Sequence, residues 1–222
     1  MIEVIHPSRL ARQAFFQELL PYLEQGPGVT LRQIKKDFPH IAKLDKQLDA
    51  YIAAGYIKRE NKRYELSLPF PQSIQELSLN QETFVDSQSS LAKELETLTY
   101  VTELSNETNG AILQEWTDYR RSNASLANYF FRLRQGYALT EQQEALYHIL
   151  GDVNQEYALK YMTTFLLKYL RKDQLIQKRK DIFVDALVCL GYIKQNTDGK
   201  YELQLSLDKE KLIFSWQNTT ID

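Results

Sequence analysis

The sequence predicts a mainly α-helical protein, with a winged-helix-like module of helices and a β-hairpin at each end of an all-helical middle. Two observations support this class. Apolar residues recur at helical spacing over most of the 222-residue chain. In addition, nearly the same phrase occurs twice, GYIKRENKRYELSL at 55–68 and GYIKQNTDGKYELQLSL at 191–207, and each copy changes from helical spacing to the alternation of strands. We therefore divide the chain into a first module (1–70), an acidic helical middle (71–153) and a second, degenerate module (154–222).

The first module begins with two predicted helices. Ser8 can cap the first helix, which ends near residue 25 because Gly26-Pro27-Gly28 stops it. Thr30 and Gln33 have the spacing of a capping box and open a short second helix. This second helix must end before Pro39, since the residue before a proline resists the α conformation.

A third helix and a hairpin complete the first module. Apolar spacing predicts a helix over about 41–54, and Gly55 stands where a left-handed C-terminal cap belongs. The alternating pattern that follows predicts strands at 56–59 and 63–68, joined by a turn at 60–62. The alternative is a generic three-helix bundle with an appended hairpin. We favour a winged helix-turn-helix because the cap glycine joins the third helix directly to the hairpin, which forms the wing.

The rest of the chain is predicted to be mostly helical. The middle has few glycines and prolines and is rich in Ala, Leu, Glu and Gln, which predicts helices at about 80–104, 110–134 and 140–150. The last of these opens with a second capping-box pattern, Thr140 and Gln143. The second module is predicted to contain helices at about 154–170 and 173–190, a hairpin with a turn at 197–199, and a strand at 211–216.

The two modules differ in length upstream of the repeated phrase. Leu23 precedes Gly55 by 32 residues, whereas its counterpart Leu170 precedes Gly191 by 21. The eleven missing residues are about the length of the second helix and its turn. The sequence therefore predicts that the hairpin is repeated, while the helix-turn-helix is present once.

The N-terminal phrase RQAFFQELLPYL…VTLRQIKKDFP…AGYIKRENKRYELSLP resembles proteins catalogued as domain of unknown function 1803, a family of Gram-positive bacteria. The resemblance extends over most of the chain, and the length fits. It implies no established activity, and no functional residues are carried over from it.

Charge is unevenly distributed along a chain whose formal net charge is −2. Residues 30–63 carry nine basic and four acidic side chains, a net charge of +5. Residues 70–157 carry five basic and thirteen acidic side chains, and residues 158–204 carry nine basic and five acidic ones. Two basic segments thus flank an acidic middle, and each basic segment contains one copy of the repeated phrase.

The sequence indicates neither a membrane protein nor a secreted one. No run of about 18 apolar residues occurs, and the N-terminus lacks the pattern of a signal peptide. The single cysteine excludes an internal disulfide framework and suggests a reducing compartment. We therefore expect a cytoplasmic protein.

No catalytic or metal-binding pattern stands out. His6, His40 and His148 are widely spaced, without the spacing of metal ligands. Cys189 lies on the last turn of a predicted helix, where a packing role is favoured over a nucleophile. The P-loop, G-x-S-x-G and G-x-G-x-x-G motifs are missing. We expect no enzymatic activity, metal or cofactor, and an unrecognised enzyme is the weakest alternative.

The sharpest functional prediction is a regulatory protein whose first module binds double-stranded DNA. In a winged helix the third helix enters the major groove, and the wing lies on the backbone or in the minor groove. Side chains able to neutralise phosphates lie on the second helix, the third helix and the wing, with one glutamine able to read adenine. The candidate residues are Arg32, Lys35, Lys36, Lys43, Lys46, Gln47, Lys58, Arg59, Lys62 and Arg63.

Two observations oppose DNA binding. Asp45 and Asp49 flank the polar face of the third helix, where they would repel phosphate. That helix carries no arginine, although arginine to guanine is the commonest specific base contact. The alternative function is a protein–protein adaptor, in which the winged-helix modules are scaffold. The acidic helical middle would then dock a protein partner or, in a homodimer, a second copy of the chain.

Overall fold

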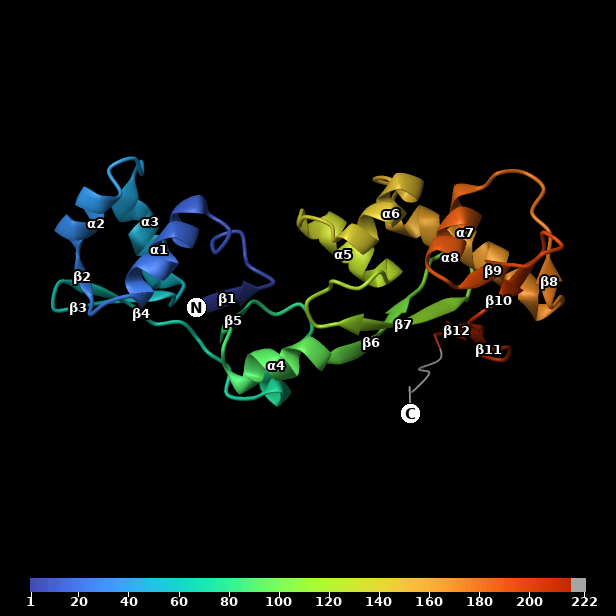
Figure 1. Ribbon diagram of the computed structural model, residues 1–222, viewed down its shortest axis with the longest axis horizontal. Helices are drawn as coiled ribbons and strands as arrows, with labels where there is room; N and C mark the ends of the chain where they lie inside the picture. Colours follow the sequence, from blue (N-terminus) through green and yellow to red (C-terminus); the bar gives the residue numbers. More distant parts are fainter. Residues whose placement is uncertain (217–222) are drawn as a thin grey trace. The chain divides into compact units, whose positions relative to one another are not determined.

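The computed structural model describes residues 1–216, which divide into two compact units (Figure 1). The first unit is Met1–Thr97, and the second begins at Leu98. Residues 70 and 153, where the sequence predicts boundaries between modules, lie inside these units. The final residues of the predicted second module, 217–222, lie outside the described residues.

The predicted mainly α class is wrong, because the protein is mixed α/β. Within the described residues, helices make up 38% and strands 21%, and there are eight helices and four sheets. The predicted all-helical middle accounts for the error. It contains strands as well as helices.

Three helices lie over one small sheet in the first unit (Figure 1). The helices are α1 (Ala14–Glu24), α2 (Leu31–Asp37) and α3 (Leu44–Ala53). The sheet has the order β2-β4-β3, with strands β2 (Val29–Thr30), β3 (Ile57–Glu60) and β4 (Arg63–Leu66). The predicted three helices and hairpin are therefore present. Strand β2 is an addition that the sequence did not predict, and α1 begins six residues after Ser8, which was expected to cap it.

Local sequence explains how these elements begin and end. Thr30 Oγ1 accepts a hydrogen bond from the Gln33 N–H, and Gln33 Oε1 accepts one from the Thr30 N–H, so the predicted capping box is formed. Gly55 has a φ of +77° and ends α3 in the left-handed conformation that glycine tolerates. Asn61 and Lys62, both at positive φ, form the two-residue turn between β3 and β4.

The remainder of the first unit completes its core. Strand β1 (Ile2–Ile5) pairs antiparallel with β5 (Thr83–Asp86), and the unit also contains the 3₁₀ helix η1 (Ile74–Glu76) and α4 (Ser90–Thr97). Phe84 on β5 is 1% exposed, and its ring lies 5.2 Å from that of Tyr56 and 6.4 Å from that of Phe16. Residues beyond 70 therefore contribute to the same core as α1 and the hairpin.

The second unit combines a four-stranded sheet with four helices. The sheet has the order β11-β12-β7-β6, formed by β6 (Thr99–Leu104), β7 (Ile112–Asp118), β11 (Ser206–Asp208) and β12 (Ile213–Ser215). Helices α5 (Leu126–Gln135) and α6 (Glu141–Leu150) are followed by α7 (Gln155–Leu166), its 3₁₀ extension η2 (Leu167–Leu170) and α8 (Ile182–Cys189). A smaller sheet consists of β8 (Gln174–Leu175), β9 (Ile193–Gln195) and β10 (Tyr201–Leu203).

The predicted helices at 80–104 and 110–134 are the main local errors. Strand β5 and helix α4 occupy most of the first range, and β6 replaces its end. A run of β-branched and aromatic residues, TYVT at 99–102, favours a strand over a helix there. Strand β7 alternates, with Leu113, Glu115 and Thr117 buried on one side. The helical spacing of apolar residues in α4 runs directly into β6, so the sequence pattern did not show where the strand begins. The helices predicted at 140–150 and 154–170 are confirmed.

The helix predicted at 173–190 is half right, because α8 begins at residue 182. Strand β8 occupies its start and pairs with β10, with Leu175 opposite Tyr201. The loop 176–181 then leads to α8, which Asp181 caps by accepting a hydrogen bond from the Phe183 N–H. The strand predicted at 211–216 is confirmed as β12, which pairs parallel with β7.

The two copies of the repeated phrase have the same backbone arrangement. The small sheets have the orders β2-β4-β3 and β8-β10-β9, and in each the second strand of the hairpin lies in the centre. The Tyr56 N–H donates to the Tyr51 carbonyl, and the Tyr192 N–H donates to the Leu187 carbonyl. Thirteen residues, including α2, separate β2 from α3, whereas six separate β8 from α8. The second copy therefore keeps the sheet and lacks α2.

Candidate nucleic-acid interface

Helix α2 contacts the hairpin at its start and α3 at its end. At its start, Thr30 pairs with Arg63 of β4, next to the hairpin turn. At its other end, Lys35 forms a 2.8 Å ion pair with Asp45 in the first turn of α3. The three elements that carry the predicted site residues are therefore neighbours, and α2 links the other two.

Five of the ten predicted residues are exposed and have no ion-pair or side-chain hydrogen-bond partner within the described chain. Two lie one helical turn apart on α2, two lie at the start of α3, and one lies in the hairpin turn. They are Arg32, Lys36, Lys43, Lys46 and Lys62. These side chains can neutralise phosphates without first breaking an internal contact.

The remaining five are engaged within the protein. Lys35 binds Asp45, and Lys58 lies 3.4 Å from Glu60 and 3.6 Å from Glu65. An Arg63 guanidinium N–H donates to the Gly28 carbonyl at 2.6 Å. The Arg59 guanidinium lies 5.5 Å from the centre of the Tyr64 ring, and it remains exposed. These four side chains are oriented by their partners.

Gln47, the one predicted base-reading residue, is oriented away from that role. Its Nε2 donates to the Ala42 carbonyl at 2.9 Å, and its Oε1 accepts from the Tyr51 hydroxyl at 3.4 Å. A bidentate contact to adenine needs both of these atoms. Gln47 is thus built into the start of α3 and the core beneath it.

Lys43 precedes α3 in an unusual backbone conformation. Its φ of 54° and ψ of 37° lie in the left-handed region, and its side chain forms no cap hydrogen bond. This region is disfavoured for a residue with a β-carbon, typically by roughly 1–2 kcal/mol. Strain of this kind concentrates at functional positions, and here it fixes where the Lys43 side chain leaves the chain.

Acidic groups border the same surface. Asp37 at the end of α2 accepts a 2.7 Å hydrogen bond from the Tyr22 hydroxyl. Burial and then this hydrogen bond raise the pKa of Tyr22 to about 12, so the tyrosine hydroxyl stays a hydrogen-bond donor. Asp49 on α3 is exposed. The predicted repulsion of phosphate by α3 thus persists for Asp49, while Lys35 offsets Asp45.

Residues 2–98 match the family model described as Domain of unknown function (DUF1803). The match confirms the resemblance seen in the sequence. It covers the first unit from residue 2 and ends one residue beyond it, whereas the sequence resemblance predicts a match over most of the chain. No curated protein and no solved structure matches the chain. The candidate interface therefore lies wholly within the DUF1803 segment.

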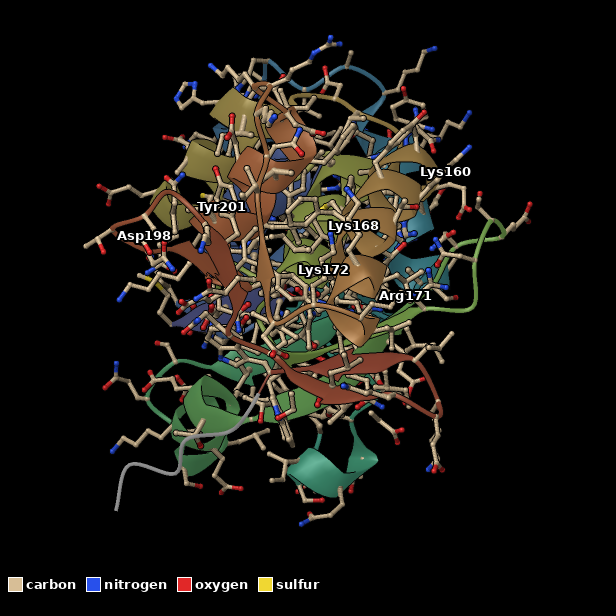
Figure 2. All side chains as sticks on the ribbon, turned by 90° about the vertical axis from the view of Figure 1, so that its right-hand side faces the viewer. Lys160, Lys168, Arg171, Lys172, Asp198 and Tyr201 are labelled. Carbon is tan, nitrogen blue, oxygen red and sulfur yellow. The ribbon has the colours of Figure 1, made fainter. Side chains whose placement is uncertain are left out.

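A second basic row was missed in the sequence. Lys160, Lys168, Arg171 and Lys172 follow one side of α7 and η2 (Figure 2). Lys160 and Lys168 are eight residues apart, which keeps them on one face of the helix, and Arg171 and Lys172 directly follow η2. The Lys168 ammonium lies 4.8 Å from the centre of the Phe165 ring. This row belongs to the second unit and offers an internal comparison for the first.

Gly28 was read as a helix stop, yet it also fixes the hairpin. A β-carbon at this position would lie 2.5 Å from Glu65 Cγ, so the Glu65 side chain on β4 packs against Gly28 and would have to move for a larger residue. Among residues 1–216, no group of three or more His, Cys, Asp or Glu side chains could hold a metal ion. In the same range, no helix has the length and apolar character needed to span a bilayer.

Proposed function

We propose that the DUF1803 segment binds double-stranded DNA as a winged helix, with α3 at the major groove and the β3–β4 hairpin on the backbone. The order α1-β2-α2-α3-β3-β4, with the hairpin completing a small sheet, supports this proposal. Winged helices place their third helix in the major groove and use the hairpin as a wing.

One observation carries the proposal: five unpaired cations occur on three elements that contact one another. Arg32 and Lys36 lie on α2, whose ends contact the hairpin at Arg63 and α3 at Asp45. Lys62 stands in the hairpin turn. Basic side chains without internal partners release counterions from DNA at little cost, because no existing contact must be broken.

The contacts favour affinity over sequence recognition. Phosphate contacts position a protein on DNA, whereas base-edge contacts specify the sequence. Gln47 is occupied within the protein, and α3 carries lysines but no arginine. If all five cations meet phosphates, the logarithm of affinity should fall with the logarithm of salt with a slope of about −4.5. We expect weak discrimination between duplex sequences.

The test is a salt titration of binding to a fluorescently labelled short duplex, measured by anisotropy between about 50 and 200 mM salt. Lys43→Glu/Lys46→Glu should weaken binding at least tenfold and flatten the slope by about two or more. The matched control is Lys168→Glu/Arg171→Glu, which makes the same change of charge on the basic row of the second unit (Figure 2). That variant should bind DNA with an affinity much closer to that of the wild type.

Two outcomes contradict the proposal. One is no measurable binding at the lowest salt concentration, which would leave the protein–protein adaptor as the alternative. The other is an equal loss of affinity in both double variants, because net charge alone would then explain the binding. Circular dichroism of each variant establishes that the fold is retained.

A further inference from the structure

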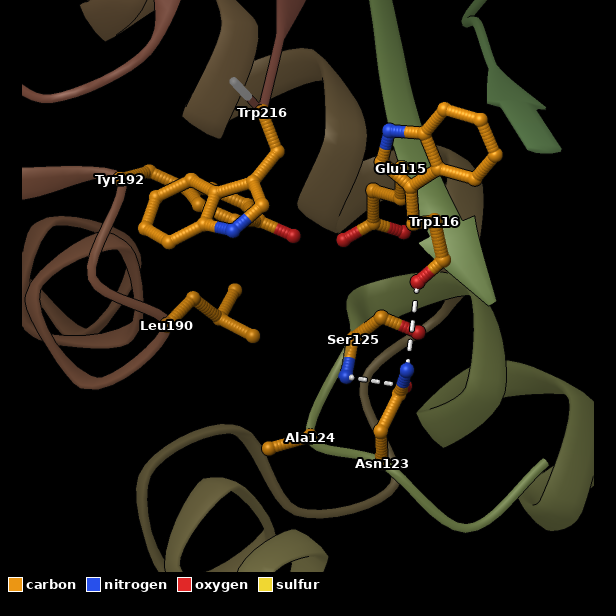
Figure 3. A pocket seen from close by; sticks show the side chains of 8 residues that line it. All are labelled: Glu115, Trp116, Asn123, Ala124, Ser125, Leu190, Tyr192 and Trp216. Carbon is orange, nitrogen blue, oxygen red and sulfur yellow. Dashed lines mark hydrogen bonds between the residues drawn. The ribbon is translucent and has the colours of Figure 1, made fainter. Parts of the chain in front are cut away.

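A cavity in the second unit combines a buried acid, a buried hydroxyl and both tryptophans of the chain (Figure 3). Its volume is about 180 Å³. The lining comes from β7, from the segment before α5, from the start of the second hairpin and from the end of β12. The lining residues are Glu115, Trp116, Asn123, Ala124, Ser125, Leu190, Tyr192 and Trp216.

Glu115 is 2% exposed and carries its acid group into this cavity. Its Oε1 accepts from the Leu126 N–H at 2.8 Å, and its Oε2 accepts from the Ala127 N–H at 2.7 Å, both in the first turn of α5. Each carboxylate oxygen retains a second lone pair. The ion pairs found in the described chain do not include Glu115. The nearby Arg121 acts on it by charge alone.

Tyr192 supplies the second polar group. The residue is 4% exposed, and its hydroxyl has no hydrogen-bond partner among the described residues. The hydroxyl points toward the Glu115 carboxylate across the cavity (Figure 3). A buried polar group without a partner destabilises a fold, so each such group calls for an explanation.

The equivalent tyrosine in the first unit shows what this hydroxyl lacks. The Tyr56 hydroxyl donates to a Glu82 carboxylate oxygen, and it also lies 3.0 Å from Ser8 Oγ. Tyr56 and Tyr192 occupy the same place in the repeated phrase and receive the same backbone hydrogen bond. In the second unit the Tyr192 side chain lines a cavity, and none of the described residues takes the place of Glu82 as partner of its hydroxyl.

The tryptophans form the rim. Trp116 is 37% exposed and Trp216 is 41% exposed, so solvent reaches part of each tryptophan that lines the cavity. The Trp216 ring centroid lies 6.0 Å from that of Tyr192. Indole faces attract cations, and tryptophan does so best among the aromatic side chains. A cavity of about 150 Å³ is already large enough to hold benzene.

We propose that this cavity binds a small organic ammonium ion, a primary amine carried on a single ring. The ammonium group donates hydrogen bonds to Glu115 and to the Tyr192 hydroxyl, and the ring lies against the tryptophans. An ammonium has three donors and no acceptor, which matches a carboxylate with unused lone pairs and a hydroxyl without a partner. This inference concerns the second unit and does not depend on DNA binding by the first.

Intrinsic fluorescence of the full-length protein tests the proposal, because both of its tryptophans line this cavity. The probe is benzylamine, and benzyl alcohol is its neutral counterpart of nearly the same shape. Benzylamine should change the tryptophan emission saturably, at least tenfold more tightly than benzyl alcohol. Burial raises the pKa of Glu115 to about 7, so the bound cation should be favoured as pH rises through 7 and the carboxylate ionises.

Variants separate the cavity from general effects on the fold. Tyr192→Phe removes one hydrogen bond to the ligand and should weaken benzylamine binding about five- to tenfold. Glu115→Gln should abolish the preference for benzylamine over benzyl alcohol. Tyr169→Phe is the matched control: it removes the other buried hydroxyl without a partner, which does not line this cavity, and should leave binding unchanged.

Three results would overturn the proposal. Benzylamine could fail to give a saturable change in emission. Benzyl alcohol could bind as tightly as benzylamine, which would point to an uncharged ligand or to bound water. Finally, Tyr169→Phe could weaken binding as much as Tyr192→Phe, which would show that the effect does not come from the cavity.

Discussion

At the scale of single residues, Tyr56 and Tyr192 show how one repeated position acquires two environments. Both rings are buried, and both residues begin a hairpin after a glycine at positive φ. Only the Tyr56 hydroxyl has partners within the described chain, Glu82 and Ser8. The same residue at the same position of the repeat therefore determines the backbone conformation and the burial of the ring, but not the hydrogen-bond partners of the hydroxyl.

This difference predicts that the same substitution, Tyr to Phe, changes the stability of the two units differently. Tyr56→Phe should lower the free energy of unfolding of the first unit by about 1–2 kcal/mol, because it removes a partly buried hydrogen bond to the Glu82 carboxylate. Tyr192→Phe should change that of the second unit by less than about 0.5 kcal/mol, or increase it, because its hydroxyl has no bond to lose. Chemical denaturation followed by circular dichroism and tryptophan emission measures both. Equal losses would contradict the assignment of partners.

The candidate sites were only partly predictable at this scale. The sequence identified which residues of the first module are basic, and spacing placed them on the correct elements. It could not show that Lys35 meets Asp45 or that Arg63 meets the Gly28 carbonyl, since these contacts join residues 10 and 35 positions apart. Glu115 was one acid among thirteen in an acidic segment. Only its place between Leu113 and Thr117 on a strand reveals that it points inward.

At the scale of elements, the short hairpins and the two helices opened by capping boxes were predicted well, and the long central strands were not. Capping boxes and turn residues act over three or four positions, so the sequence displays them directly. Strands β6 and β7 depend on pairing with each other, with Val101 opposite Trp116. A strand also gains from partners distant in sequence, as β7 does from β12, and no local pattern reports such a partner.

The β3–β4 turn allows stability and DNA binding to be separated in one variant. Lys62 has a φ of 64°, a conformation that glycine adopts without strain. Lys62→Gly should therefore raise the free energy of unfolding by about 0.5–1 kcal/mol, while it removes one phosphate contact and reduces the salt slope by about one. Denaturation and DNA anisotropy of the same preparation test this. A loss of stability would contradict the strained conformation of Lys62. An unchanged salt slope would contradict its contact with phosphate.

At the scale of the whole molecule, the chain has two cores that share no residue. One core gathers residues from Ala11 to Phe84, and the other gathers residues from Leu104 to Phe214. The DUF1803 match ends at residue 98, one residue beyond the first unit. The boundary predicted at residue 70 missed this, because the two prolines after the hairpin mark a turn without marking the end of the core.

This organisation predicts which fragment folds. Residues 1–97 expressed alone should unfold cooperatively, since they contain β5 and the Phe84 ring that packs on Phe16 and Tyr56. Residues 1–70 lack both and should be less stable by several kcal/mol, in line with the loss of a large buried aromatic side chain. Thermal unfolding followed by circular dichroism compares the two. If both fragments melt alike, residues 71–97 are not part of the first folding unit.

The second hairpin module shows what the first would be without helix α2. It retains a helix, a sheet of the same order and the glycine-to-hairpin junction, yet six residues stand where α2 and its flanks occupy thirteen. The scaffold is therefore complete without α2. Apart from Ile34, which is buried in the core, α2 adds a surface to the first unit, so its exposed positions are open to selection for a partner while the fold beneath them stays the same.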